Sequence, residues 1–360
     1  MKKSPIVIIA VLLLCGSSLF ASPTFSQELL ARAQAGDASA QCDLAWCYKE
    51  GLGIKTDCVE AVKWYRLAAD QGLASAQYNL AWMYYYGEGV VQNYKEAVKW
   101  YHLAADQGLA SAQNSLAWMY SKGEGVVQDK QEAVKWYHLA ADQGLASAQY
   151  NLAWMYSKGE GVVQDNKEAV KWYRLASDQG LAPAQYNLGV MYSNGEGVVQ
   201  DKQEAVKWYR LAADQGFASA QYNLGVMYYN GEGVVQDKQE AVKWYRLASD
   251  QGVAPAQYLL GVMYHNGEGV VQDKKEAVRW YRLAVDQGYA DAQYNLGMMY
   301  SIGEGVVQNH KEAYFWLLLA AANGLEEAKV ERDTIAQELS KEQQEEVQAR
   351  ATKWFAEHSD

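Results

Sequence analysis

The sequence predicts an all-α protein, a solenoid of eight 36-residue helix-turn-helix repeats that ends in a C-terminal helical cap. Half of the 360 residues are hydrophobic and only four are proline, a composition that favours packed helices over disorder. The hexapeptide Gly-Glu-Gly-Val-Val-Gln occurs seven times at a spacing of 36 residues, beginning at Gly87, Gly123, Gly159, Gly195, Gly231, Gly267 and Gly303. A unit of this length cannot bury its own hydrophobic face, so the fixed period predicts units stacked on their neighbours.

A second series of glycines has the same period and sets the number of repeats. Its members are Gly36, Gly72, Gly108, Gly144, Gly180, Gly216, Gly252, Gly288 and Gly324. A degenerate hexapeptide from Gly51 to Thr56 adds an eighth loop to the seven identical ones. We therefore expect eight repeats over residues 27–324.

The N-terminus has the parts of a secretory signal peptide, expected over residues 1–26 with cleavage near 21–26. Lys2 and Lys3 form the positive region, Ile6 to Cys15 is mainly apolar, and Ala21 is a candidate cleavage site. The apolar stretch is shorter than the roughly 20 residues that a membrane span needs. We expect an exported protein, periplasmic or secreted. An uncleaved N-terminal anchor is an alternative, as is a lipoprotein attached through Cys15, although Leu14 is bulky for the residue before a lipidated cysteine.

The charge of the mature chain argues against nucleic acid as a partner. Removing Lys2 and Lys3 leaves 30 basic and 43 acidic side chains, a net charge of about −13, which repels a polyanion. Three cysteines would remain after cleavage, all in the first repeat: Cys42, Cys47 and Cys58. An oxidising compartment permits one disulfide. We expect Cys47 and Cys58 to form it, with simple packing of small residues as the alternative.

Each repeat is expected to hold two helices, A and B. In the second repeat, helix A is expected from about Ser75 to Tyr86 and helix B from about Asn93 to Asp106. Pro183 and Pro255 occupy the position of Ser75 in later repeats, and proline suits the first position of a helix because its missing N–H has no partner there.

Helix B carries start and stop signals in every repeat. An Asp or Asn followed three residues later by Glu has the form of a capping box, and the glycine of Asp-Gln-Gly is a typical left-handed end. The pairs are Asp57/Glu60, Asn93/Glu96, Asp129/Glu132, Asp165/Glu168, Asp201/Glu204, Asp237/Glu240, Asp273/Glu276 and Asn309/Glu312.

The faces of the two helices follow from 100° of rotation per residue. The buried stripe of helix B is expected to be Ala97, Trp100, Tyr101 and Ala104, and that of helix A to be Ala76, Leu80, Met83 and Tyr84. The small Ala81 becomes glycine in the later repeats, which predicts close approach of the two helices.

The repeat pattern resembles a known family. The stretch 184–213 reads Ala-Gln-Tyr-Asn-Leu-Gly-Val-Met-Tyr, then Gly-Glu-Gly-Val-Val-Gln-Asp, then Glu-Ala-Val-Lys-Trp-Tyr-Arg-Leu-Ala-Ala. It is similar to the Sel-one-like repeat (SLR), a tetratricopeptide-related helical hairpin, in its bacterial secreted type. The resemblance covers residues 27 to 324 and implies a right-handed superhelix. Residues 325–360 resemble the terminal capping helices of such arrays, and their many glutamates suit a polar outer end.

The recurrent loop is interpreted as a joint rather than a phosphate-binding loop. No Gly-Lys-Ser/Thr follows it, and the element before it is a helix rather than a strand. We expect its first glycine to end helix A and its two valines to fill the space between the helices of the hairpin. Its glutamates predict an acidic row along one edge, either a solvated rim or a surface for a basic partner: Glu88, Glu124, Glu160, Glu196, Glu232, Glu268 and Glu304.

Nothing in the sequence forms a catalytic or metal-binding motif, so we expect neither an enzyme nor a cofactor. None of the histidines has partners at metal-ligand spacing, and no serine-nucleophile motif occurs. Some cysteine-rich members of the family that the chain resembles are linked to β-lactam binding or hydrolysis. A weak hydrolase or binder of β-lactams or peptidoglycan is therefore an alternative, although this chain lacks a disulfide in every repeat. A passive structural spacer is a further one.

Aromatic residues of helix A are the candidate binding site for a protein or peptide. In the tetratricopeptide-like arrays that the chain resembles, helix A lines the concave groove, and exposed aromatics there are typical hot spots. One column holds Tyr78, Tyr150, Tyr186, Tyr222, Tyr258 and Tyr294, and the other holds Trp46, Trp82, Trp118 and Trp154. From the fifth repeat the tryptophans give way to Val190, Val226, Val262 and Met298. The function expected is an exported scaffold or adaptor, monomeric, with packing between repeats as the alternative role of these rings.

Overall fold

The computed structural model describes residues 23–358, which are helical throughout and contain no β-strand. Residues 1–22 of the predicted signal peptide, with Lys2, Lys3 and Cys15, lie outside the described residues. Among residues 23–358, no helix has both the length and the apolar character needed to cross a membrane. The predicted all-α repeat fold is confirmed.

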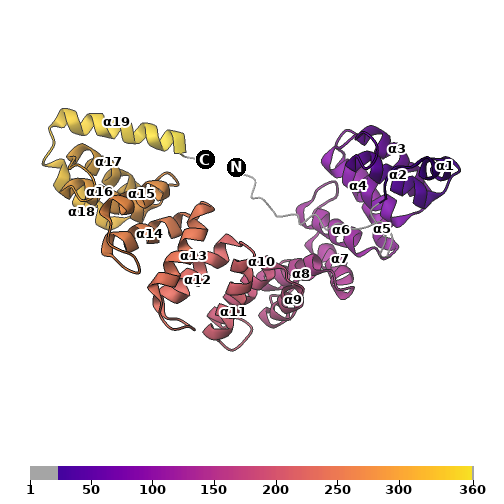
Figure 1. The fold of residues 1–360 in the computed structure, drawn as a ribbon, viewed down its shortest axis with the longest axis horizontal. Helices are drawn as coiled ribbons and strands as arrows, with labels where there is room; N and C mark the ends of the chain where they lie inside the picture. The colour runs from indigo at the N-terminus through magenta and orange to yellow at the C-terminus, as the bar shows by residue number, and fades with distance from the viewer. Residues whose placement is uncertain (1–22, 359–360) are drawn as a thin grey trace. The chain divides into compact units, whose positions relative to one another are not determined.

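The helices fall into two compact units (Figure 1). The N-terminal unit comprises residues 23–184 with 196–198, and the C-terminal unit comprises 185–195 and 199–358. The N-terminal unit contains α1 (Gln27–Gln34), α2 (Ala38–Glu50), α3 (Cys58–Asp70), α4 (Ala74–Tyr86), α5 (Tyr94–Asp106), α6 (Ala110–Lys122), α7 (Lys130–Asp142), α8 (Ala146–Lys158) and α9 (Asn166–Asp178). The boundary falls within α10 (Ala182–Asn194). The C-terminal unit continues with α11 (Lys202–Asp214), α12 (Ala218–Asn230), α13 (Lys238–Asp250), α14 (Ala254–Asn266), α15 (Lys274–Val285), α16 (Ala290–Ile302), α17 (His310–Ala322), α18 (Glu326–Ala336) and α19 (Lys341–His358).

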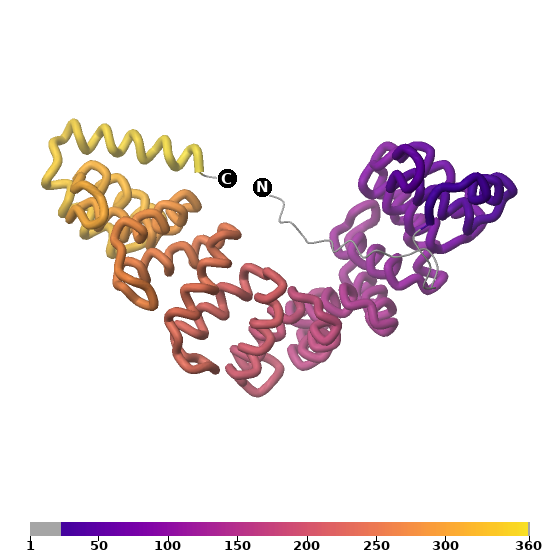
Figure 2. The backbone as a smooth tube through the Cα atoms, in the orientation of Figure 1, coloured from indigo at the N-terminus to yellow at the C-terminus, as the bar shows by residue number. Residues whose placement is uncertain are grey.

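Successive hairpins lie beside one another within each unit, as the backbone trace shows (Figure 2). The A helices are the even-numbered α2 to α16, and the B helices are the odd-numbered α3 to α17. Helix α1 precedes the first hairpin and buries Leu29 and Ala33 against α2. In the 36-residue period, α1 occupies the position of a B helix but is shorter. It covers the first A helix, α2.

The B helices begin at the predicted caps, but the capping box is only half formed. Asp129 accepts a hydrogen bond from the backbone N–H of Glu132 at 2.9 Å. The Asp129 N–H donates to the Tyr120 carbonyl at 2.9 Å instead of to the Glu132 carboxylate, which pairs with Lys135 at 2.7 Å. The same aspartate or asparagine cap is present on every B helix, α3 to α17.

The two glycines of the recurrent loop have different roles. Gly159 adopts a left-handed conformation (φ 67°) and ends α8. Gly161, also left-handed at φ 72°, lies against the first turn of α7 in the preceding repeat, where a Cβ atom would come within 2.5 Å of the Lys130 carbonyl carbon. The loop is therefore a joint between repeats as well as within a hairpin.

The two valines of the loop also differ, and the prediction that both fill the hairpin is wrong for the second. Val90 is partly buried against the core, but Val91 is 88% exposed. The chain is extended at this point, so consecutive side chains point to opposite sides and only one can face the hairpin. The same exposure recurs at Val127, Val163, Val199, Val235, Val271 and Val307.

The core is built from alanine, leucine and methionine of the A helices against tyrosine of the B helices. In the C-terminal unit the helix-A position equivalent to Ala81 is glycine, and the ring of a buried tyrosine fills the space. A Cβ atom on Gly225 would lie 2.6 Å from the Tyr245 ring. The predicted close approach is therefore present.

Replacing Gly225 with alanine is expected to lower the free energy of unfolding by about 1 kcal/mol. The overlap with the Tyr245 ring costs more than the roughly 1 kcal/mol that alanine gains in helix propensity. Gly297→Ala is the control, since Leu317 stands there in place of the tyrosine and its nearest atom, 3.0 Å away, is on a flexible side chain. Chemical denaturation measures both, and equal stabilisation of the two variants would contradict the packing argument.

A ladder of buried glutamines joins consecutive repeats. Gln149 on α8 is 4% exposed. Its Nε2 donates to the Ala141 carbonyl at the end of α7, in the preceding repeat, at 3.1 Å, and its Oε1 accepts from Gln179 Nε2 at the end of α9, in its own repeat, at 2.8 Å. The equivalent donors to the helix-A glutamine of their own repeats are Gln71, Gln107, Gln143, Gln215, Gln251, Gln287 and Asn323.

Candidate functional site

The predicted tryptophan column lies on the A helices of the N-terminal unit. Trp46, Trp82, Trp118 and Trp154 come from α2, α4, α6 and α8, and each is partly buried, at the margin between core and solvent. The Lys49 ammonium lies 5.2 Å from the centre of the Trp46 ring and 4.4 Å from that of Trp82. One lysine thus bridges indoles of two consecutive repeats, so this part of the column is a continuous surface.

Further contacts enrich this column in aromatic and cationic groups. The ring centroids of Trp82 and Tyr86 are 4.6 Å apart, and the Lys122 ammonium lies 4.6 Å from the Trp118 centroid. Both are contacts within one helix, between residues four positions apart. The most buried tryptophans, such as Trp100 and Trp172, lie instead on the B helices.

The tyrosine column is more deeply engaged in packing. Tyr78 lies 5.5 Å from the buried Tyr101 ring, and Tyr222 lies 6.0 Å from Tyr245. Equivalent pairs form at Tyr150, Tyr186 and Tyr258. The sequence predicts that these rings point away from the core, but they lie against it. The helix-A residue three positions later is alanine or glycine, which leaves space for the ring above the inner tyrosine.

Several tyrosine hydroxyls also bridge to the next repeat. Tyr78 bonds Ser115, and Tyr186 bonds Asn223. Burial raises the pKa of both tyrosines, despite these hydrogen bonds. Tyr294, in the last repeat, packs against the cluster that α17 forms with the cap. The tyrosines thus join neighbouring repeats, and the tryptophans of the same helices are partly buried.

The predicted disulfide is absent, because Cys47 and Cys58 are separate thiols, as is Cys42. Cys47 faces the core of the first hairpin, with its Sγ 3.4 Å from the Pro23 carbonyl, and burial raises its pKa to about 11. Cys58 is the first residue of α3, and its carbonyl meets the loop glycine Gly89. The two side chains serve different contacts, which corrects the expected pairing.

Four of the seven glutamates of the recurrent loop form ion pairs instead of a bare acidic row: Glu160, Glu232, Glu268 and Glu304. Glu160 pairs with Lys130 at 2.6 Å, and Glu304 pairs with Lys274 at 2.7 Å, each lysine coming from the preceding repeat. Glu268 accepts from Tyr229 at 2.6 Å as well as from a lysine. The hydrogen bonds from Tyr229 and Lys238 hold the pKa of Glu268 below its usual value. The hydrogen bond to Glu268 also raises the pKa of Tyr229 to about 12. The predicted rim therefore offers little free negative charge.

The histidines take part in structural contacts. His102 lies 3.1 Å from Asp106, and His138 lies 3.0 Å from the Tyr156 hydroxyl in the next repeat. His265 lies beside Lys274 and Glu304, where burial and the neighbouring ammonium lower its pKa. Within residues 23–358, no group of histidine, cysteine, aspartate or glutamate side chains is arranged to hold a metal ion.

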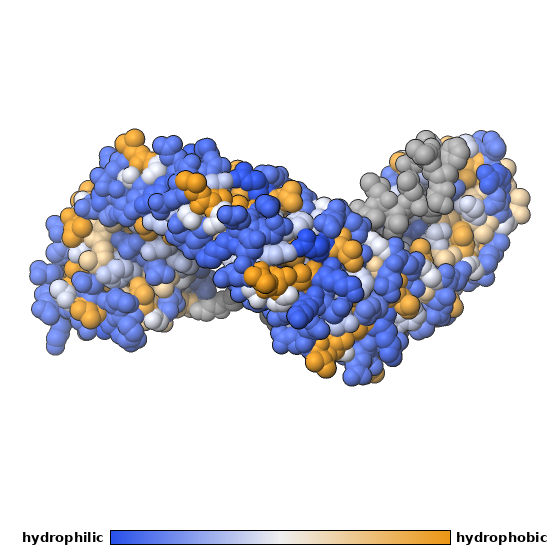
Figure 3. All heavy atoms as spheres, turned by 90° about the horizontal axis from the view of Figure 1, so that it is seen from below, coloured by the Kyte–Doolittle hydropathy of each residue, from blue (hydrophilic) through white to orange (hydrophobic). Residues whose placement is uncertain are grey.

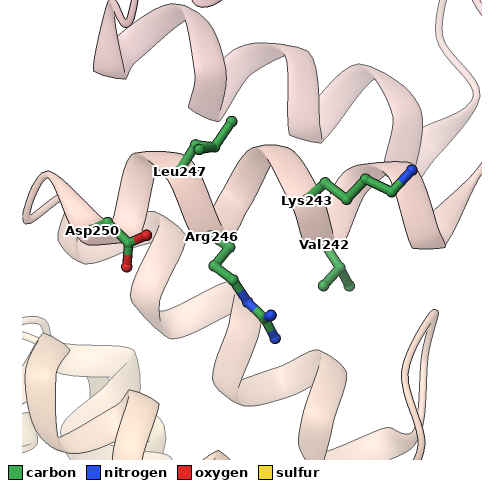
Figure 4. A pocket seen from close by; sticks show the side chains of 5 residues that line it. All are labelled: Val242, Lys243, Arg246, Leu247 and Asp250. Carbon is green, nitrogen blue, oxygen red and sulfur yellow. The ribbon is translucent and has the colours of Figure 1, made fainter.

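Two shallow pockets lie on the surface of the described residues. A shallow pocket of about 280 Å³ lies on α13, lined by Val242, Lys243, Arg246, Leu247 and Asp250 (Figure 4). On the face drawn in Figure 3, hydrophobic side chains form small separate patches on a mostly hydrophilic surface. Such a surface suits contacts with an extended partner rather than enclosure of a small molecule.

One set of residues escaped the sequence interpretation. The eighth B helix departs from the repeat at three positions. Phe315 and Leu318 stand where the other B helices carry basic residues, and Ala322 stands where they carry an aspartate. The uncharged run from Ala313 to Ala322 could have indicated this difference. The structure explains it, because the C-terminal helices pack against this run.

The comparisons identify the family. The Sel1 repeat model matches eight consecutive segments: 38–73, 74–109, 110–145, 146–181, 182–217, 218–253, 254–289 and 290–325. The chain belongs to the Sel1 repeat family. Sel1 repeat proteins are generally protein-interaction scaffolds and are typically not enzymes.

Two solved structures are similar over most of their length. A Sel1 repeat protein from Oxalobacter formigenes is 36% identical over 84% of this chain and 88% of its own, with a TM-score of 0.67. A protective antigen of uropathogenic Escherichia coli strains, which displays an SLR fold, is 28% identical over 92% of this chain and 94% of its own, with a TM-score of 0.60. No curated protein matches the chain.

Proposed function

We propose that this Sel1 repeat protein is an exported, non-enzymatic adaptor that binds a protein or peptide on the A-helix surface. The observation that carries the proposal is the tryptophan column of Trp46, Trp82, Trp118 and Trp154, in which every member is only partly buried, while Trp100, Trp172, Trp208 and Trp244 of the B helices are buried in the core. Large aromatic rings at the margin between core and solvent supply much contact area for little loss of conformational entropy.

The proposed surface has two parts of different chemistry. In the N-terminal unit it presents indole rings with lysines beside them. In the C-terminal unit the same positions hold the aliphatic Val190, Val226 and Val262. We expect the N-terminal part to supply most of the binding free energy and the C-terminal part to add aliphatic contacts.

Export is part of the proposal and rests on the N-terminal sequence. Residues 1–26 would be removed with cleavage near 21–26, residues 27–324 would act as the repeat array, and residues 325–360 would close its end. The mature protein would then act in the periplasm or outside the cell.

The adaptor proposal is tested by replacing Trp82, Trp118 and Trp154 together with valine, the residue of the later repeats. Affinity capture with the mature chain first identifies bound proteins, and titration calorimetry then measures each purified partner. A hot-spot residue contributes about 2 kcal/mol or more to the binding free energy. We therefore expect no detectable binding once all three tryptophans are replaced. Helicity and the melting temperature should change little, because each tryptophan is only partly buried.

Leu67, Leu103 and Leu139, each replaced with alanine, form the matched control. They are 48%, 41% and 48% exposed on B helices of the same unit, so their loss should leave binding intact. If the tryptophan variant keeps full affinity, or if it loses its cooperative melting, the tryptophans are not a binding surface.

A further inference from the structure

Helix α17 differs from every other B helix on its outer surface. On α13, Leu247 points to one side of the helix while Val242 and Arg246 point to the other, and all three line the shallow pocket (Figure 4). The residues of α17 at the five pocket positions are Tyr314, Phe315, Leu318, Leu319 and Ala322. Leu247 is 46% exposed, but its equivalent Leu319 is fully buried. The outer surface of α17 is therefore apolar and covered.

The cover is α19, the last described helix, which runs beside α17 (Figure 1). Val347 and Ala351 of α19 share one buried cluster with Phe315 and Leu319 of α17. Gln348 Nε2 donates a hydrogen bond to the Tyr314 hydroxyl at 3.0 Å. One stripe of α19 thus fills the apolar surface, which we call the docking surface (Tyr314, Phe315, Leu318 and Leu319).

An exchange of ion-pair partners makes this docking specific. On the other B helices the glutamate of the first turn pairs with a basic residue three positions later, as Glu132 does with Lys135. On α17 that position is Phe315, so Glu312 has no such partner in its own helix. Arg350 of α19 takes the role: its guanidinium pairs with Glu312 and lies 3.9 Å from the centre of the Phe315 ring.

The attachment of α19 is nonetheless slight. Only Val347 and Ala351 are buried among its 18 residues, and a second ion pair, Lys311 with Glu346 at 2.6 Å, lies at the surface. A cleft of about 260 Å³ remains between α17 and α19, lined by Phe315, Trp316 and Trp354 among others. Trp354 and Phe355 add only partly buried contacts, and exposed ion pairs contribute little, so few interactions hold α19 on α17.

We propose that α19 is a displaceable cover, and that the docking surface on α17 binds an amphipathic helix of a partner protein. The partner helix has apolar residues at positions i and i+4 and an arginine at i+3, the chemistry of Val347, Ala351 and Arg350. Glu312 selects the arginine, and Phe315 and Leu319 accept the apolar stripe. The site is separate from the A-helix surface of the adaptor proposal and does not depend on it.

The test uses the full-length chain and a fluorescein-labelled peptide of residues 341–358 as the probe. Arg350→Glu places a carboxylate beside Glu312, which should release α19 and open the docking surface. Fluorescence anisotropy should show that the peptide binds the Arg350→Glu variant at least about tenfold more tightly than it binds the wild-type chain. In the wild type, α19 occupies the docking surface. Hydrogen exchange of residues 341–358 should rise in the same variant.

Two further variants separate docking from general disruption. Glu312→Arg combined with Arg350→Glu restores the ion pair with reversed charges, so peptide binding and fast exchange should both be lost. Lys353→Glu makes the same charge change on α19 at a side chain that is 78% exposed, and it should behave as the wild type. If α19 stays protected in Arg350→Glu, or if the released surface binds no peptide, the proposal is overturned.

Discussion

Replacing Gly161 with alanine is expected to lower the free energy of unfolding of its repeat by about 2 to 5 kcal/mol. The left-handed backbone, at φ 72°, costs an L-residue about 1–2 kcal/mol. The added methyl also overlaps the Lys130 carbonyl of the preceding repeat, and an overlap of this kind adds about 1–3 kcal/mol. The clash is with backbone, so no side-chain rotation relieves it.

Gly180→Ala separates the two costs. Gly180 is also left-handed, at φ 86°, but no atom lies within 4 Å of the position of its Cβ. We expect this variant to lose only the backbone cost of about 1–2 kcal/mol. Urea denaturation measures both variants, and hydrogen exchange over α7 and α8 locates the effect. Equal losses at the two glycines would mean that the loop does not set the contact between repeats.

Replacing Gln149 with leucine is expected to lower the free energy of unfolding by about 1–3 kcal/mol. The leucine is close in size but cannot donate to the Ala141 carbonyl or accept from Gln179, which Gln149 does at 3.1 and 2.8 Å. Each lost hydrogen bond contributes about 0.5–1.5 kcal/mol, and the Ala141 carbonyl and Gln179 Nε2 each keep a second partner, the Gly144 N–H and the Leu175 carbonyl. The loss reaches two repeats, because the glutamine bonds both the preceding and the following B helix.

Gln164→Leu is the matched control for this change. Its Nε2 also donates to a backbone carbonyl, that of Ser157, at 2.9 Å, but the side chain is exposed and water can replace the bond. We expect a change within about 0.5 kcal/mol. A loss at Gln149 no larger than at Gln164 would show that the glutamine ladder does not stabilise the array.

The order of helices and their ends followed from local signals in the sequence. The 36-residue period placed every hairpin, because each unit repeats the same start and stop residues. Asp129 caps α7 as expected, and Gly159 ends α8. These outcomes depend on the backbone conformation of a few neighbouring residues, which a sequence pattern can specify.

Predictions that required knowledge of the next repeat were less successful. Val91 is solvent-exposed where we expected it to fill the hairpin, and Glu160 is paired with Lys130 where we expected an open rim. For Glu160 the deciding neighbour, Lys130, is 30 residues away in the preceding hairpin, whereas Val91 is exposed because only one of two adjacent valines faces the hairpin. The period shows that these residues are equivalent, but it does not show what they contact.

By itself, the sequence determined that this protein is an all-α array of eight Sel1 hairpins, because hydrophobic period, caps and turn glycines are local properties repeated along the chain. Only the tertiary structure decided how deeply each aromatic side chain is buried. It placed the predicted tyrosines on the inner tyrosines and left the tryptophans partly exposed, and it covered Phe315 and Leu319 with α19. The burial of a side chain depends on contacts between elements that are distant in sequence. These contacts form only when the helices pack, so a local sequence pattern does not specify them.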